Sequence, residues 1–158
     1  MYVQQLYMKE LEDILKISTK LPIRKKTVLN ITHSSIWMKD EVLSVLKPFE
    51  ISIEQFNVLR ILRGKKGNPA NLQDIQDRMI SKMSNTTRLV DKLILKGYVE
   101  RFTCEKNRRK VDIFITNTGL DILKEIDPII EKTEHKITSN LTETELETSN
   151  TLLTKLRK

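Results

Sequence analysis

The chain has 158 residues and a net charge of +7, and its length is typical of one domain with one hydrophobic core. Hydrophobic residues make up 39% and aromatic residues only 5%, with four glycines and four prolines, which argues against disorder and an all-β fold and favours long helices. The single cysteine, Cys104, excludes an intramolecular disulfide, and no apolar stretch reaches the ~20 residues that span a bilayer, so we expect a cytoplasmic protein with no membrane partner.

The first third of the chain predicts two helices. Residues 3–18 place apolar side chains along one face, as an amphipathic helix does. Residues 26–47 form a second helix, which Pro48 closes. Neither segment carries a group suited to catalysis.

The middle of the chain predicts three short helices joined by turns, in the order of a helix-turn-helix. Ser52 is the expected N-cap of the first helix, Gln55 occupies its capping-box position, and Gly64 is its C-cap. The second helix covers residues 71–79 and the third covers residues 81–97, each with apolar side chains at helical spacing.

Two β-strands are predicted directly after these helices. Residues 98–103 and 111–115 roughly alternate apolar and polar side chains, and the apolar positions are β-branched or aromatic. The connection between them, residues 104–110, is polar and basic. A helix-turn-helix followed by such a hairpin is a winged helix-turn-helix, in which the hairpin is the wing.

The remaining residues predict helices again. Asn117 or Thr118 can cap a helix that Pro128 either kinks or restarts, and Thr142 opens a last helix with a capping-box pattern. The apolar stripes of the terminal helices need a cover that a small DNA-binding unit cannot supply, so we expect a homodimer.

The expected fold is therefore mainly α with a small β-hairpin wing, of the α+β class. We expect a single domain over residues 1–158, in which residues 1–47 and 120–158 form a helical dimerisation region. Residues 48–119 form the winged helix-turn-helix lobe that binds DNA.

The positive charge is concentrated in one segment. Residues 78–110 contain ten lysines and arginines but only three acidic residues, whereas the rest of the chain carries 18 of each sign. Such a local excess is typical of a nucleic-acid-binding surface. The alternative is a basic face that is solvated and has no partner.

The third helix of this region has an apolar face for the core and a polar face for a ligand. An arginine such as Arg88 can donate two hydrogen bonds to a guanine edge, hydroxyl groups can bind bases or phosphates, and Lys92 suits a phosphate. The candidate DNA-binding residues are Ser84, Asn85, Thr87, Arg88, Lys92, Arg108, Arg109 and Lys110.

Two of these assignments have alternatives within the chain. Arg88 could pair with Asp91 or Glu50 instead of with DNA. Arg108 and Arg109 are expected at the wing tip, where they could enter the minor groove of an A·T-rich segment, or else form a solvated turn.

The residues of this segment resemble the multiple-antibiotic-resistance regulator (MarR) family. RLVDKLILKGYVER at 88–101 and NRRKVDIFITNTG at 107–119 are similar to the family stretches T-R-x-x-D-x-L-x-x-x-G-x-V-x-R and D-x-R-x-x-x-x-x-L-T-x-x-G. The element order agrees over roughly residues 26–158. Asn107 replaces the family's usual wing aspartate, which is expected to brace the wing arginines by a charge-assisted hydrogen bond.

The resemblance implies a homodimeric transcriptional regulator. Its terminal helices would form the dimer interface, and its two winged lobes would reach successive major grooves. A small-molecule effector is a further partner that this function allows.

Other residues suggest sites of a different kind. His33 and Trp37, one helical turn apart, could line an effector pocket between the dimer helices and the DNA-binding lobe, although a buried interface aromatic is the simpler role for Trp37. Cys104 could be a redox sensor because basic neighbours lower a thiol pKa. His33 and His135 stand alone, without a ligand cluster at metal-binding spacing, so we expect no metal and no cofactor.

The leading hypothesis is a sequence-specific DNA-binding regulator, a homodimeric repressor of a palindromic operator that a small ligand releases. The alternative is a winged-helix module that binds a protein, or an architectural protein that binds DNA without base specificity. We do not expect an enzyme, because the sequence offers no set of nucleophile, base and orienting residue and no phosphate-binding glycine loop.

Overall fold

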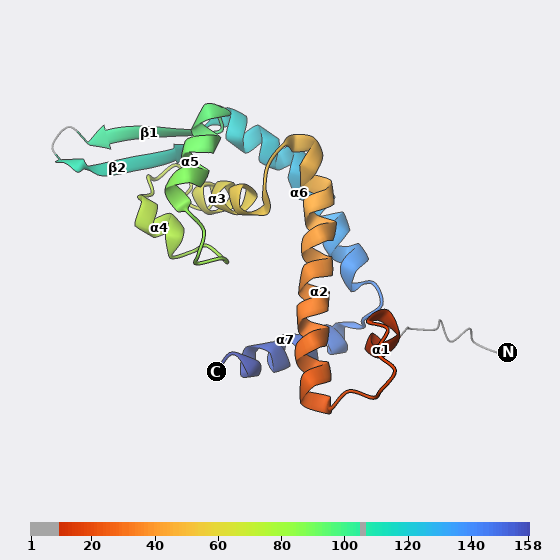
Figure 1. The fold of residues 1–158 in the computed structure, drawn as a ribbon. Helices are drawn as coiled ribbons and strands as arrows, with labels where there is room; N and C mark the ends of the chain where they lie inside the picture. The colour runs from red at the N-terminus through yellow and green to blue at the C-terminus, as the bar shows by residue number, and fades with distance from the viewer. Residues whose placement is uncertain (1–9, 105–106) are drawn as a thin grey trace. The chain divides into compact units, whose positions relative to one another are not determined.

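The computed structural model describes residues 10–104 and 107–158, with the backbone alone at 103–104 and 107–110 (Figure 1). The chain divides into two compact units, the first ending at Asp40 and the second beginning at Glu41. A long helix, α2 (Ile23–Leu46), crosses the boundary between them.

The expected helix over residues 3–18 is confirmed only over four residues, and the prediction is wrong at Glu10 and over residues 15–18. Helix α1 covers only Leu11–Ile14, and residues 3–9 lie outside the described residues. Lys16 has a φ of 54°, in the left-handed region that a right-handed helix cannot continue through. Helix α2 then begins directly after Pro22, three residues earlier than expected.

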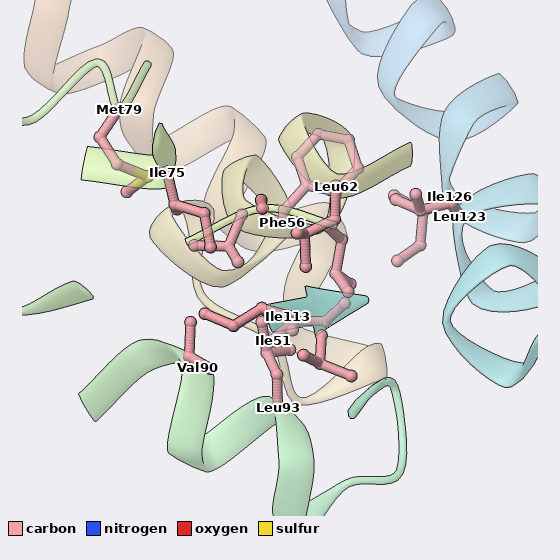
Figure 2. Packing of buried hydrophobic residues seen from close by; sticks show 14 of the residues in the cluster. Ile51, Phe56, Leu62, Ile75, Met79, Val90, Leu93, Ile113, Leu123 and Ile126 are labelled. Carbon is pink, nitrogen blue, oxygen red and sulfur yellow. The ribbon is translucent and has the colours of Figure 1, made fainter. Parts of the chain in front are cut away.

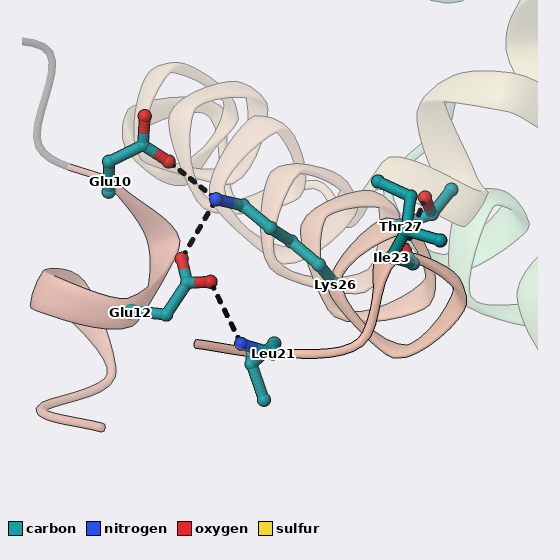
Figure 3. Close-up of polar contacts among 6 residues, drawn as sticks. All are labelled: Glu10, Glu12, Leu21, Ile23, Lys26 and Thr27. Atoms are coloured by element: carbon teal, nitrogen blue, oxygen red, sulfur yellow. Dashed lines mark hydrogen bonds and ion pairs between the residues drawn. The ribbon is translucent and has the colours of Figure 1, made fainter. Parts of the chain in front are cut away.

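A charged cluster joins the α1 segment to the start of α2 (Figure 3). Nζ of Lys26 lies 2.5 Å from Oε2 of Glu10 and 2.9 Å from Oε2 of Glu12, and the N–H of Leu21 donates to Oε1 of Glu12 at 3.2 Å. The hydrogen bond from Lys26 lowers the pKa of Glu12, and the hydrogen bond to Glu10 raises the pKa of Lys26.

The second unit contains the predicted three short helices. They are α3 (Ile53–Arg63), α4 (Leu72–Gln76) and α5 (Thr86–Leu95), and a short 3₁₀ helix at Lys47–Phe49 precedes them. The capping box of Ser52 and Gln55 and the C-cap Gly64 are confirmed. Helices α4 and α5 are shorter than predicted, because residues 77–85 form the turn between them.

The wing is a hairpin of β1 (Val99–Cys104) and β2 (Asn107–Ile115), which pair antiparallel. The predicted connection over residues 104–110 is therefore wrong, since β2 already begins at Asn107. The register is regular from Val99–Ile115 to Thr103–Val111 and then shifts, so that Cys104 pairs with Asn107. An isolated antiparallel bridge between Ala70 and Ile113, not predicted from the sequence, attaches the segment before α4 to strand β2.

The last two helices are α6 (Asn117–Thr138) and α7 (Glu143–Leu156). The N-cap of α6 is Thr116 rather than Asn117 or Thr118, and the helix continues through Pro128 without a restart. The capping box at Thr142 is confirmed, with Glu145 as its second member. None of the residues of α7 is buried.

The hydrophobic core of the second unit holds the short helices to the hairpin base (Figure 2). Most of its largest fully buried side chains come from α3, α4, α5, β2 and α6, among them Leu59, Ile75, Leu93, Ile113 and Leu123, and Leu46 of α2 and Met79 of the turn after α4 join them. Burial of an aliphatic side chain of this size stabilises the fold by roughly 1.5–3 kcal/mol. The core therefore fixes α5 and the base of the wing in one packed unit.

Candidate nucleic-acid interface

Helix α5 has one buried and one exposed face, as the sequence pattern predicts. Val90 and Leu93 are fully buried against the core, whereas Thr87, Arg88 and Lys92 are exposed. The buried side chains fix the rotation of the helix about its axis, and that rotation determines which side chains point outward. Three of the candidate DNA-binding residues therefore share an exposed surface.

Two other candidates, Ser84 and Asn85, lie before the helix rather than on it. The third helix was expected from residue 81, but Asn85 is its N-cap, and the side-chain oxygen of Asn85 accepts the N–H of Arg88 at 3.0 Å. Asn85 therefore orients the first turn of α5, and the two N–H donors of its side chain form no hydrogen bond with the described residues and can bind DNA. Ser84 is half-buried in the turn.

Gln76 and Thr86, which the sequence did not single out, fix this turn. The Gln76 amide donates to the carbonyl of Lys82 at 2.6 Å, and its oxygen accepts a hydrogen bond from the hydroxyl of Thr86. The Lys82 ammonium donates to the carbonyl of Asp77. These bonds cross the turn, so that no periodic pattern in the sequence could have revealed them.

A hollow of about 430 Å³ lies at the start of α5. It brings together four of the candidates, Ser84, Asn85, Arg88 and Lys92. The other lining residues are Glu54, Ser81, Met83 and Leu89. Besides the carboxylate of Glu54 and two apolar side chains, the lining carries hydroxyl, amide and cationic groups, which suit the edges of bases and the phosphate backbone.

The intramolecular partners considered for Arg88 are occupied by other cations. Asp91 pairs with Arg101 of β1 at 2.9 Å, and Glu50 pairs with Lys96 at 3.4 Å. Among the residues that the structure describes, Arg88 forms no ion pair. Arg88 can therefore bind an anion or a base without first breaking a salt bridge to another described residue.

The three candidates on the wing lie on β2, not in a loop at the tip. Thr103 pairs with Val111 and Cys104 pairs with Asn107, so Arg108, Arg109 and Lys110 lie between those two partners, in an irregularity of the strand. A β-bulge of this kind twists a strand locally. The side chains of these residues, and that of Cys104, lie outside the described part of the chain.

The base of the wing is fixed by a close contact with the start of α6. The hydroxyl of Thr116 donates to the carbonyl of Gly97 at 2.7 Å and accepts the N–H of Gly119 at 3.0 Å. A Cβ atom at Gly119 would overlap the carbonyl oxygen of Tyr98, far inside any real contact distance. Only glycine fits there.

The predicted effector residues lie on α2. His33 and Trp37 are both exposed and one helical turn apart, in the unit that ends at Asp40. Within residues 10–104 and 107–158 no group of three or more His, Cys, Asp or Glu side chains could hold a metal ion. No helix in the described part of the chain is long and apolar enough to cross a membrane.

Comparison with known proteins identifies relatives over most of the chain. The sequence profile of the MarR family matches residues 51–111. The multiple antibiotic resistance protein MarR of Escherichia coli is 31% identical over 121 residues, 75% of this chain and 82% of the relative.

Two solved structures have a similar fold. Bordetella bronchiseptica BpsR, solved in a study of how 6-hydroxynicotinic acid regulates its DNA binding, superimposes with a TM-score of 0.76 at 16% identity, over 89% of this chain and 99% of BpsR. A cysteine-to-serine mutant of E. coli MarR in complex with operator DNA superimposes with a TM-score of 0.72 at 23% identity, over 94% of this chain and 99% of that chain.

Proposed function

The chain belongs to the MarR family, and we propose that it is a sequence-specific regulator of transcription that binds double-stranded DNA as a homodimeric repressor of a palindromic operator. The observation that carries this proposal is the exposed face of α5. It presents Thr87, Arg88 and Lys92 outward, while the opposite face is buried in the core. A rigid helix with one polar face of this kind suits the major groove.

The groups on this face have distinct roles in the proposed complex. Arg88 donates two hydrogen bonds to O6 and N7 of a guanine, because the planar guanidinium matches that edge. Lys92 binds a phosphate, since an ammonium is a point charge on a flexible stem. The hydroxyl group of Thr87, and that of Ser84 in the turn before the helix, bind base edges or phosphates.

The wing contributes positive charge beside α5. We assign Arg108, Arg109 and Lys110 to the minor groove and the adjacent phosphates, where A·T-rich segments concentrate negative potential. The ion pair between Arg101 and Asp91 links the wing to α5, which supports a fixed spacing between the two DNA contacts. Both side chains of this pair are partly exposed, so it orients the wing more than it stabilises the fold.

Apolar surface that the described residues leave exposed supports the association of two copies. Helix α2 has 24 residues, of which only Leu46 is buried, and α7 has no buried residue. A second copy covers such surface most economically, with residues 1–47 and 120–158 as the dimerisation region and 48–119 as the DNA-binding lobe. The exposed apolar side chains on the two helices are Ile23, Val28, Ile36, Trp37, Met38, Leu43, Leu152, Leu153 and Leu156.

A small-molecule effector that releases the DNA is part of this proposal. The relative BpsR, whose DNA binding 6-hydroxynicotinic acid regulates, is a precedent for such a ligand in a protein of this fold. The candidate contacts in this chain are His33 and Trp37, an imidazole and an indole on adjacent turns of α2. We place the protein in the cytoplasm, where it would meet the DNA that it regulates.

Selection of bound duplexes from a random pool, with the purified full-length protein, tests the proposal. We expect a palindrome with two half-sites, and footprinting on that sequence should show a bounded protected region. Uniform coating of DNA would instead favour the architectural binder, and no binding at low salt would favour a protein-interaction module. Arg88→Ala serves as the matched variant, because it leaves the core intact and should remove base preference at one position of each half-site.

A further inference from the structure

The turn before α5 carries an apolar side chain that the fold does not use. Met83 is 96% exposed, whereas Met79, four residues earlier, is buried in the core. Exposure of a long apolar side chain costs free energy relative to its burial. Among the described residues, Met83 is the most exposed large hydrophobic side chain, ahead of Ile80 in the same turn at 88%, so it is accessible to a ligand.

The surroundings of Met83 are mainly polar, with two cations, Arg88 and Lys92, and one carboxylate, that of Glu54. Met83 lines the same hollow at the start of α5 as Arg88 and Lys92. The backbone of the turn is fixed by the hydrogen bond from Gln76 to the carbonyl of Lys82, the residue next to Met83. The methionine side chain is thus presented from a fixed backbone, among groups that attract a polyanion.

We infer that Met83 contacts the C5-methyl group of a thymine in each half-site of the operator, and so contributes to sequence specificity. This inference rests on the proposed function. The thymine methyl is the apolar group on the major-groove edges of the four bases, and apolar side chains recognise it by direct contact. Methionine suits the task because its unbranched, polarisable chain adapts to the position of the methyl group.

The charge around Met83 favours DNA over a protein as its partner. An apolar protein partner would need a continuous apolar surface, whereas the lining of this hollow consists mainly of charged, hydroxyl and amide groups. Two of those groups are cations, Arg88 and Lys92. A thymine methyl, flanked by polar base edges and phosphates, matches one apolar side chain within a cationic surface.

Replacement of thymine by uracil tests the contact, because the exchange removes only the methyl group. In an operator obtained by selection, each thymine is replaced in turn by deoxyuridine, and affinity is measured for wild type and Met83→Ala. We expect at least one position per half-site where the wild type loses affinity about fourfold and the variant loses less than about 1.5-fold. On the unmodified operator, Met83→Ala itself should bind about fourfold more weakly.

Leu95→Ala is the matched control. Leu95 is 86% exposed at the last residue of α5, roughly 14 Å along the helix axis from its first turn, and does not line the hollow. This variant should keep the full sensitivity to uracil. Neither substitution touches a buried residue, so both variants should unfold at the wild-type temperature.

Two results would overturn the contact. Met83→Ala could remain as sensitive to uracil at every position as the wild type, or it could lose affinity equally for all sequences, which would place the side chain against the sugar-phosphate backbone. Failure of the proposed function would look different, because selection would then yield no preferred sequence at all.

Discussion

At the scale of single residues, the loss of the Arg88 side chain should reduce base specificity more than the loss of any other candidate. It is exposed on α5, and its possible internal partners Asp91 and Glu50 bind other cations. Arg88→Ala should therefore cost about 1–3 kcal/mol of binding free energy on the operator and relax the preference at one base pair. Fluorescence anisotropy on the operator and on its single-base variants measures both effects.

Lys92 provides the contrast, because a phosphate contact carries no base information. Lys92→Ala should weaken binding to operator and random DNA alike and lower the slope of log affinity against log salt by about one unit. An Arg88→Ala variant that behaved in this way too would show that Arg88 binds phosphate and not a base.

The exposed face of α5 was predictable from the sequence, because four apolar residues at helical spacing assign the opposite face to the core. The role of Asn85 was not predictable to the same degree. Its side chain caps the helix only because the helix starts at Thr86, and that start depends on the hydrogen bond between Gln76 and Thr86. Hydrogen bonds across a turn produce no regular spacing of residue types, so a sequence pattern cannot reveal them.

At the scale of elements, the junction between the wing and α6 depends on Gly119. A methyl group there would overlap the backbone oxygen of Tyr98, which cannot rotate away as a side chain can. Gly119→Ala should therefore destabilise the protein by at least the 1–3 kcal/mol typical of overpacking, as measured by urea unfolding. Asn117→Ala, an exposed change in the same helical turn, should stay within about 0.5 kcal/mol of wild type. Equal stability of the two variants would contradict this account of the junction.

The capping box of α4 makes the stability of the fold pH-dependent. The N–H of Asn71 donates to Asp74 at 3.2 Å and the ammonium of Lys65 lies 3.3 Å from the same oxygen, and these bonds hold the pKa of Asp74 below its usual value. A lowered pKa in the folded state contributes stability that is present above the unfolded-state pKa of about 3.9 and is lost as the pH falls through the folded-state pKa.

Asp74→Asn should therefore be less stable than wild type at pH 6, and the difference should shrink below about pH 4. Urea unfolding at a series of pH values measures this. Ser81→Ala, an exposed and uncharged change in the turn after α4, should give a difference from wild type that does not depend on pH. A constant difference for Asp74→Asn would mean that the carboxylate contributes no charge-dependent stability.

Element types and order could be predicted from the sequence, whereas several boundaries could not. The capping boxes at Ser52 and Thr142 combine a hydroxyl with a glutamine or glutamate three residues later, and the structure has both. Strand β2 begins at Asn107, earlier than predicted, because Asn107 pairs with Cys104, and the strand then passes through Arg108 and Arg109, whose charged side chains do not resemble a half-buried strand. Pairing at the tip of a wing needs no buried face.

At the scale of the whole molecule, the helices outside the DNA-binding lobe leave apolar surface exposed. Leu152 and Leu156 lie one turn apart on α7, both exposed. If α7 packs against a second copy, Leu152→Glu combined with Leu156→Glu should give a folded monomer, because the change places two carboxylates in an apolar interface. Sedimentation velocity measures the mass and circular dichroism the helix content.

Thr154→Glu is the matched control, since it adds one carboxylate to the same end of α7 without removing a leucine. It should remain a dimer. A doubly substituted protein that stayed dimeric at micromolar concentration would remove α7 from the interface. The family fold could be expected from the sequence, but which apolar residues would meet in the proposed dimer could not, because that depends on the surfaces of two chains.

The arrangement of two recognition helices in one dimer should be visible in the spacing of the operator. If both α5 helices enter the major groove on one face of the duplex, the half-site centres lie about one turn, roughly 10 bp, apart. Insertion of about 5 bp between the half-sites turns one of them to the opposite face, so that the dimer can bind only one half-site at a time. Affinity should then fall to that of an isolated half-site, which an electrophoretic mobility titration measures directly.

An insertion of about 10 bp returns both half-sites to one face of the duplex but moves them roughly 34 Å further apart, so a dimer of fixed geometry should not recover its affinity. Undiminished affinity after the 5 bp insertion would mean that the two lobes bind independently.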